Sequence, residues 1–253
     1  MRYLIILALL LTTSSGYAIE LDGQSDFARR VELTSSLSAR IESVEVSVGQ
    51  RVSAGEVLLT LVTTGFDTAV EMARAEADAL RPLVQRRLTE LEKAQELFAR
   101  DSLAVVELQN AEQDHDIAAA RLAAAEAKLA NALFLLSQAR IRSPIDGVII
   151  EVDAFAGQFV NTRVENRRLL TIVDPRSMTA SASLPHELAV PSLLRRAATV
   201  RYGDRDFRGR VIEVGRQVTI GKNSHPAVTL RVGFTSDGNL AAGLPVRITI
   251  ADE

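Results

Sequence analysis

The sequence predicts a mixed α+β, elongated multidomain protein: a small β-sandwich that is split by an inserted antiparallel α-helical coiled-coil hairpin and followed by a small β-barrel. Residues 39–62 and 145–173 both run through alternating apolar residues into Gly-Gln-x-Val and end on Leu-Leu-Thr-(Leu/Ile)-Val, as two homologous β halves would. The stretch between them has a helical period and almost no glycine. A long helical segment has therefore been inserted into one β module.

Residues 1–18 are predicted to be a cleaved signal peptide. Arg2 gives a positively charged start, Leu4–Leu11 is an apolar run, and Gly16-Tyr17-Ala18 provides small residues for cleavage. The apolar run is too short for a standard membrane span, although an uncleaved anchor is the alternative. We therefore expect an exported, soluble mature chain, in which residues 19–37 are a linker or the start of the barrel.

The composition excludes several classes of function. Without cysteine, the chain can form no disulfide, thiolate metal site, cysteine nucleophile or lipid attachment at an N-terminal cysteine. A net charge of -3 gives no electrostatic basis for nucleic-acid binding. No pair of histidines or carboxylates has the spacing of metal ligands. We expect a non-enzymatic protein with no catalytic residue, metal or cofactor, whose association with membranes comes from its partners.

The two β halves are assigned to residues 38–65 and 141–175. Each half alternates apolar and polar residues over about four short strands, and two such halves would pack as a sandwich with quasi-twofold symmetry. Glycines are expected to form the turns between strands. These turn residues are Gly49 and Gly55 in the first half, and Gly147 and Gly157 in the second.

Residues 66–140 are predicted to form the helical hairpin. An alanine recurs every seventh residue from Ala104 to Ala139, and a leucine follows four residues after most of them, His115 being the exception. The preceding segment has its own apolar stripe, and a break near residues 100–103 predicts two antiparallel arms of about 50 Å each. The stripe of the first arm consists of Val70, Ala77, Val84, Leu91 and Phe98.

Asp67 is the candidate N-cap of the first arm, and Asp101 or Ser102 is the candidate for the second. Pro82 lies inside the first arm, and we expect a kink there rather than a break because the apolar register passes through it unchanged. Both arms have broad charged faces. These faces favour a projecting rod over the alternative, a pair of helices buried inside one globule.

Apolar residues gather at the far end of the predicted rod, where no core is available: Leu97, Phe98, Leu103, Val105 and Val106. Two interpretations stay open. The side chains pack on one another within the helical turn, or they form a docking surface for the helices of another protein.

Residues 176–253 read as short alternating strands with one short helix, at Glu187–Arg196, which suggests a small β-barrel. The predicted strands are Thr179–Leu184, Ala198–Arg201, Phe207–Val214, Ala227–Phe234 and Val246–Ile250.

Two motifs resemble the split lipoyl-like domain of the periplasmic adaptor family, also called membrane fusion proteins. They are Val44-Glu-Val-Ser-Val-Gly-Gln-Arg-Val-Ser-Ala-Gly-Glu-Val-Leu and Ile141-Arg-Ser-Pro-Ile-Asp-Gly-Val-Ile, on either side of the hairpin. Phe207-Arg-Gly-Arg-Val-Ile-Glu-Val and Gly243-Leu-Pro-Val-Arg-Ile-Thr-Ile resemble the last strands of the family's barrel. The resemblance covers nearly the whole predicted mature chain.

The resemblance implies a periplasmic adaptor of a tripartite efflux system, arranged as a ring of copies between an inner-membrane transporter and an outer-membrane channel. A resistance-nodulation-division transporter is favoured, and an ABC-type exporter or type I secretion system is the alternative. A structural coiled-coil periplasmic protein and a periplasmic metal-binding or hydrolytic protein are weaker candidates. A swinging lipoate or biotin carrier needs a lysine in the β halves, and the three lysines, Lys93, Lys128 and Lys222, all lie elsewhere.

In many members of this family the hairpin tip resembles Arg-x3-Leu-x6-Ser. The present chain has Lys93, Leu97 and Ala104 at these positions, so the leucine matches and the positive charge is kept. The residues that we expect to contact the channel are Lys93, Leu97, Arg100, Ser102, Leu103, Ala104 and Leu108.

Overall fold

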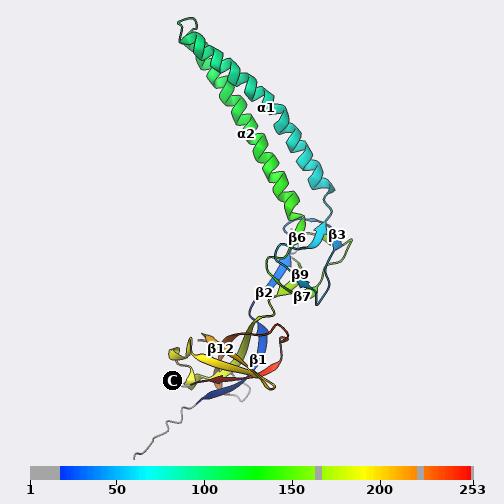
Figure 1. Cartoon of the computed structure of the whole chain (residues 1–253), viewed down its shortest axis with the longest axis vertical. Coiled ribbons are helices and arrows are strands. Elements are labelled where there is room, and N and C mark those ends of the chain that lie inside the picture. The colour runs from blue at the N-terminus through cyan, green and yellow to red at the C-terminus, as the bar shows by residue number, and fades with distance from the viewer. Residues whose placement is uncertain (1–17, 163–166, 221–224, 252–253) are drawn as a thin grey trace, which may run out of the picture. The chain divides into compact units, whose positions relative to one another are not determined.

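The computed structural model describes residues 18–162, 167–220 and 225–251 (Figure 1). Nearly all of the predicted signal peptide therefore lies outside the described residues. The chain divides into two compact units. One comprises Met1–Val31 and Val173–Glu253, and the other comprises Glu32–Ile172. The fold is mixed α+β, as predicted, with a helical hairpin, a split β-sandwich and a barrel.

The sandwich consists of two four-stranded sheets, and each sheet takes two strands from each β half. The strand orders are β2-β9-β7-β4 and β6-β5-β3-β8. When each strand is replaced by its counterpart in the other half, the first strand order becomes the second. The predicted quasi-twofold symmetry is therefore present. The strands are β2 (Arg30–Thr34), β3 (Ala39–Val44), β4 (Arg51–Val52), β5 (Val57–Leu61), β6 (Arg140–Arg142), β7 (Gly147–Val152), β8 (Phe159–Val160) and β9 (Arg168–Val173).

The repeated Gly-Gln-x-Val segments make the same hydrogen bonds. The N–H of Gly49 donates to the carbonyl of Ile149 at 2.8 Å. The N–H of Gly157 donates to the carbonyl of Ile41 at 2.9 Å. Both glycines have a positive φ, +87° and +86°, which favours glycine over residues with a Cβ. Each half thus uses one tight turn to fasten itself onto a strand of the other half.

The repeat extends further toward the N-terminus than the sequence motifs indicate. The hydroxyl of buried Ser35 donates to the carbonyl of Leu37 at 2.7 Å, and that of buried Ser143 donates to Ile145 at 2.6 Å. Both bonds satisfy a buried hydroxyl locally. Serine gives only a weak turn signal, so this part of the repeat was missed.

One of the four predicted turn glycines is not in a turn. Gly147 is the first residue of β7 and pairs with Val52 of β4. Its counterpart in the first half is Ala39, which likewise begins a strand, β3. The position therefore needs no glycine, and the grouping of Gly147 with the turn residues was wrong.

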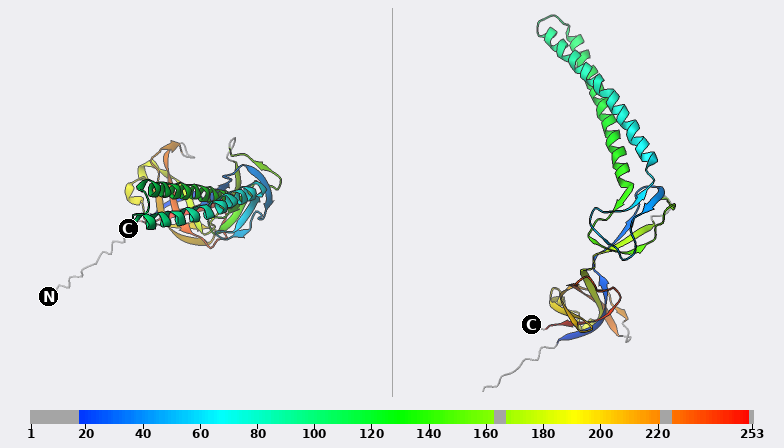
Figure 2. Two further views of the ribbon diagram at one scale, coloured as in Figure 1. Left: turned by 90° about the horizontal axis from the view of Figure 1, so that it is seen from above. Right: turned by 45° about the vertical axis from the view of Figure 1, so that its right-hand side comes forward.

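The helical arms are α1 (Thr64–Phe98) and α2 (Val105–Gln138), which run side by side in every view (Figures 1 and 2). Helix α1 is continuous through Pro82. The predicted caps were wrong: the N-cap residues are Thr63 and Ala104, and neither makes a side-chain cap bond. Asp67 instead lies in the first turn, where a carboxylate favourably meets the helix dipole.

The predicted seam between the arms is present. Its fully buried members are small: Val70 and Ala77 from α1, and Ala118, Ala125 and Ala132 from α2. The seam leucines of α2, such as Leu129, are only half-buried. Two helices alone cannot enclose a long side chain, so the small residues carry the closest packing.

The barrel closes through six strands in the order β10-β1-β15-β11-β12-β14, because β14 also pairs with β10. The two-residue strand β13 adds to the free side of β14. The strands are β1 (Ile19–Phe27), β10 (Ser177–Pro185), β11 (Ala197–Tyr202), β12 (Arg205–Val214), β13 (Thr219–Ile220), β14 (Pro226–Thr235) and β15 (Pro245–Ile250).

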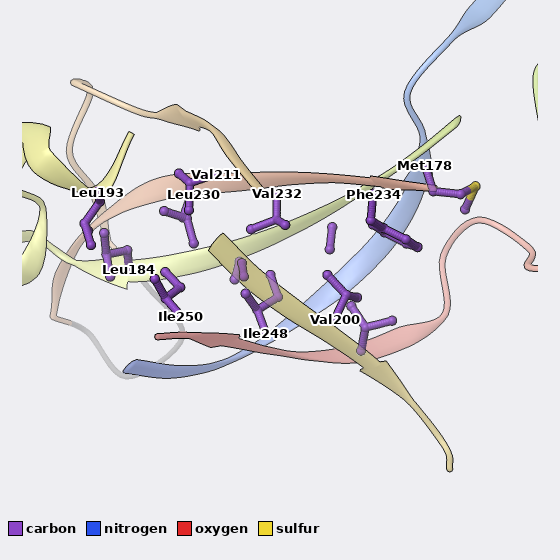
Figure 3. Close-up of a cluster of buried hydrophobic side chains, with 14 of the residues drawn as sticks. Met178, Leu184, Leu193, Val200, Val211, Leu230, Val232, Phe234, Ile248 and Ile250 are labelled. Atoms are coloured by element: carbon purple, nitrogen blue, oxygen red, sulfur yellow. The ribbon is translucent and has the colours of Figure 1, made fainter. Parts of the chain in front are cut away.

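The barrel core is filled by inward-pointing aliphatic side chains from almost every strand. Leu184, Val200, Leu230 and Ile248 are completely buried within it (Figure 3). Inward residues alternate with outward ones along each strand, as half-buried strands require. The outer faces of the strands are therefore free to carry polar residues.

The predicted helix at Glu187–Arg196 is absent. The segment instead forms two short 3-10 turns, His186–Leu188 and Pro191–Leu193. Proline has no N–H and disfavours helical geometry in the residue before it, and Val190 is accordingly extended. The presence of Pro191 in the sequence was enough to predict that no continuous helix spans this segment.

Candidate functional site

The base of the hairpin is held by the sandwich. The N–H of Leu61, just before α1, donates to the carbonyl of Ala139, just after α2, at 2.8 Å. The next residue, Val62, donates to Arg40 of β3 at 2.8 Å. Both ends of the inserted segment are therefore fixed next to each other on a rigid sheet.

Oppositely charged side chains link the two arms along their exposed flanks. Each pair is solvent-exposed, so it contributes little to stability. Together the pairs mark one antiparallel register. They are Lys128–Glu76 at 2.7 Å, Arg81–Glu126 at 3.5 Å and Arg87–Asp114 at 3.2 Å.

The turn at the tip closes with backbone hydrogen bonds. The N–H of Ser102 donates to Leu97 at 2.9 Å, and that of Asp101 donates to Phe98 at 3.0 Å. Asp101 has a φ of +51°. This is the Schellman arrangement that ends many helices, with Asp101 in the left-handed position usually taken by glycine. Asp101 therefore terminates α1 and does not cap α2.

The closed turn leaves apolar side chains in solvent. Leu97 and Phe98 on α1 are 45% and 41% exposed, and Val105 and Val106 on α2 are 53% and 59% exposed. Leu103, between the helices, is half-buried. Self-packing of the turn thus covers only part of this surface, which we call the tip patch: Leu97, Phe98, Leu103, Val105 and Val106.

The residues predicted to contact a channel occupy two levels of the hairpin. Arg100, Ser102 and Ala104 are exposed in the turn beside the tip patch. The Arg87–Asp114 pair sets the register of the arms, and this register places Lys93 level with Leu108, below the turn. Lys93 is exposed and Leu108 is half-buried.

The barrel presents a second exposed apolar surface. The chain leaves the barrel after Phe27 and returns at Ser177, so both linkers lie at one barrel end. The 3-10 turns follow β10 at the opposite end. There Leu188, Val190 and Leu194 are 44–49% exposed, and we call them the barrel-end patch.

Within the described residues, no helix is both long and apolar enough to span a membrane. In the same residues no three histidines, cysteines or carboxylates gather in an arrangement that could hold a metal ion. Among the exposed apolar side chains of the described residues, we therefore consider the tip patch and the barrel-end patch as candidate contact surfaces.

Residues 29–174, more than half of the chain, match the family described as CzcB-like, barrel-sandwich hybrid domain. The sequence is 29% identical over 217 residues to the nodulation protein NolF of Rhizobium meliloti (strain 1021), covering 85% of this chain and 58% of NolF. It is 26% identical over 129 residues to the efflux pump periplasmic linker BepD of Brucella suis biovar 1 (strain 1330), covering 50% of this chain and 32% of BepD. The match thus spans only part of each relative.

Among solved structures, the fold resembles that of MacA from Actinobacillus actinomycetemcomitans, with a TM-score of 0.76 and 17% sequence identity. The superposition covers 93% of this chain and 78% of that one. The family match includes both β halves and the hairpin between them, in agreement with the motifs and the fold. The chain belongs to the periplasmic adaptor, or membrane fusion protein, family, with a CzcB-like barrel-sandwich hybrid domain.

Proposed function

We propose that this protein is a non-enzymatic periplasmic adaptor of a tripartite efflux system, which links an inner-membrane transporter to an outer-membrane channel. The observation that carries the proposal is the tip patch at the end of a helical rod whose base is fixed in a sheet. Apolar side chains exposed at such a point favour binding to another protein.

The rod is suited to reaching a distant partner. Arms of 35 and 34 residues correspond to about 50 Å of helix. Its flanks are charged, and the exposed ion pairs between its arms keep them soluble. We assign docking to the tip patch because it combines exposed apolar side chains from both arms at the turn, next to the exposed residues Arg100, Ser102 and Ala104.

We assign the barrel-end patch to the transporter side. It lies at the barrel end away from both linkers, so a partner can approach it without meeting the connections to the sandwich. Three exposed aliphatic side chains beside Arg195 suit a protein surface with apolar and acidic residues.

We favour a transporter of the resistance-nodulation-division class, since a cleaved signal peptide is predicted and the described residues form a single helical hairpin. The relative BepD is an efflux pump periplasmic linker, which supports an efflux role for this chain. If the N-terminal segment stayed as an anchor, an ABC-type exporter or type I secretion system would be the better candidate. Several copies would surround the transporter as a ring.

The proposal is tested by photocrosslinking in the periplasm from position 103 in the tip turn and from position 194 in the barrel-end patch. We expect position 103 to capture an outer-membrane channel and position 194 an inner-membrane transporter, both identified by mass spectrometry. The matched control is position 85, an exposed residue halfway along α1, which should capture neither.

The identity of the captured transporter decides between the candidate classes. If positions 103 and 194 capture no membrane protein while the variants are folded and exported, the efflux function is excluded. A structural coiled-coil protein of the periplasm would then be the remaining interpretation.

A further inference from the structure

The outer wall of the barrel is hollowed where β12, β14 and β10 run side by side. The hollow is a groove of about 520 Å³, which is within the usual size range of small-molecule sites. The core side chains Val211, Phe234 and Met178 point into the barrel (Figure 3). Because residues alternate along a strand, a neighbour of each one faces outward and lines the groove: Arg210, Gly233 and Thr179.

The groove exists because Gly233 has no side chain. Arg210 of β12 is opposite Gly233 of β14, and Gly233 is in turn opposite Thr179 of β10. The middle position of this row is therefore empty. Beside it, the register between β12 and β14 shifts at Ile212, the extra residue of a β-bulge. A glycine within a strand and a β-bulge both occur often where a ligand approaches a sheet.

Hydrogen-bond donors border the groove on two strands besides β12. Arg208 and Arg210 alternate along β12, so their Cα atoms lie about 7 Å apart on the same face. The register of β12 and β14 places Arg208 level with Thr235, and Thr235 pairs with Ser177 of β10. Two guanidinium groups and two hydroxyl groups therefore line the same hollow.

The charges of Arg208 and Arg210 are not neutralised by the barrel. Both residues are exposed, and among the described residues neither guanidinium has an ion-pair partner. Carboxylates on the same and adjoining strands are held by other arginines instead: Asp206 by Arg201 at 2.6 Å, Glu213 by Arg231 at 2.9 Å and Asp26 by Arg30 at 3.3 Å. The groove thus has two positive charges that remain available to a ligand.

Asp26 limits the site on the side of β1. It pairs in register with Thr179, so it lies three strands from Arg210, or about 14 Å. The hydroxyl of Thr179 donates to the carbonyl of Asp26 at 3.4 Å and is therefore already engaged. An anion in the groove would be held at the β12 side, away from this carboxylate.

We propose that this groove binds a phosphate monoester, carried by a soluble molecule or by a lipid headgroup. The planar guanidinium of arginine matches phosphate with paired hydrogen bonds. A phosphate monoester offers three acceptor oxygens, enough for both arginines and the hydroxyl groups of Ser177 and Thr235, whereas a carboxylate offers two. Ile212, 51% exposed beside Gly233, supplies an apolar contact for the rest of the ligand. The inference goes beyond the adaptor role and does not depend on it.

The test measures binding by the purified exported protein to two probes. Isothermal titration uses glycerol phosphate as the soluble ester. Sedimentation uses phosphatidylcholine vesicles with and without phosphatidic acid, whose headgroup is a phosphate monoester. Replacing both Arg208 and Arg210 by Gln should weaken binding roughly tenfold or more. The matched control replaces Arg86 and Arg121, exposed on the hairpin, by Gln and should bind as the wild type does.

A second variant fills the groove without changing its charge. Gly233→Leu places a side chain on the floor, where a Cβ would meet only the side chain of Ile212, at 3.1 Å. It should weaken binding roughly tenfold as well, because the ligand loses its space. Thermal unfolding shows whether the barrel tolerates the leucine, and the arginine variant decides the question if it does not.

The two probes distinguish the sources of the phosphate. Binding of glycerol phosphate without a preference for vesicles that contain phosphatidic acid assigns the groove to a soluble ester. Binding to these vesicles alone assigns it to a lipid headgroup. The inference is overturned if neither probe binds, if the arginine variant binds as well as the wild type, or if the hairpin control loses as much. Tighter binding of a tetraglutamate peptide than of glycerol phosphate would assign the groove to acidic protein surfaces and would also overturn it.

Discussion

The barrel and the hairpin bury apolar surface in different ways. In the barrel, six strands enclose long side chains completely, and Leu230 and Ile248 have no exposed surface. In the hairpin, only small seam residues such as Ala118 and Ala125 are fully buried, while Leu129 is half-exposed. A closed barrel has an interior, whereas two helices have only a line of contact.

This contrast indicates which parts of the molecule can be changed without unfolding it. The stability of the barrel depends on its interior side chains, so residues on its outer faces can be substituted. The hairpin has almost no interior, so its stability is spread thinly along the seam and much of its apolar surface is left exposed to solvent. Four substitutions test this contrast, in order of decreasing effect on stability.

The largest loss is expected for Leu230→Ala in the barrel. Removing a completely buried leucine should destabilise the barrel by about 3 kcal/mol, from lost burial and the cavity that remains. Hydrogen exchange followed by mass spectrometry should show faster exchange in barrel peptides and unchanged exchange in residues 64–98. Equal acceleration in the hairpin would mean that the two regions do not unfold separately.

A smaller loss is expected for Leu129→Asp in the hairpin seam. Placing a charge at a half-buried position should cost about 2 kcal/mol and unwind the arms locally. The helical signal in circular dichroism should fall at lower temperature than in the wild type. The matched control is Leu133→Asp, since Leu133 is 43% exposed outside the seam and its substitution should change little.

A gain is expected for Asp101→Gly at the tip turn. Asp101 has a φ of +51°, and glycine takes this left-handed conformation without a steric cost, so the tip should become more stable by about 1 kcal/mol. Slower hydrogen exchange at residues 97–104 would show it. Unchanged or faster exchange would mean that the aspartate side chain itself stabilises the turn.

The smallest effect on stability, and a large one on function, is expected for Leu97→Asp. Leu97 is 45% exposed, so its replacement should change the free energy of unfolding by less than about 0.5 kcal/mol. Export, measured as tolerance of a pump substrate in cells, should nevertheless be lost. Gln95→Asp adds the same charge at an exposed site two residues earlier and should keep export. Wild-type tolerance in Leu97→Asp would exclude docking through this residue.

The features that the sequence predicted well are those with a strong local period. The alanine heptads gave the seam, and the repeated Gly-Gln-x-Val gave the tight turns at Gly49 and Gly157. Five of the six strands that close the barrel followed from alternation, whereas the sequence left β1 (Ile19–Phe27) undecided between a linker and the start of the barrel. In each case one residue spacing corresponds to one face of a helix or strand.

The features that it did not predict depend on contacts between distant segments. No local pattern shows that Arg210 faces Gly233, or that Ser35 repeats the bond of Ser143. The cap at Asp101 was missed because aspartate also favours helix starts, and only the backbone geometry distinguishes the two roles. The contribution of each tip residue to docking stays a prediction.

The hydrogen bond between Leu61 and Ala139 joins the two ends of the inserted hairpin at the sandwich, whatever the length of its arms. The two ends of the insertion meet at the sheet however far the arms extend, so adding residues between them changes no contact at the base. Removing one heptad from each arm at the same level would shorten the rod by about 10 Å and leave the seam in phase. Insertions or deletions of seven residues in both arms would therefore change the length of the hairpin and leave its base and the phase of its seam unchanged.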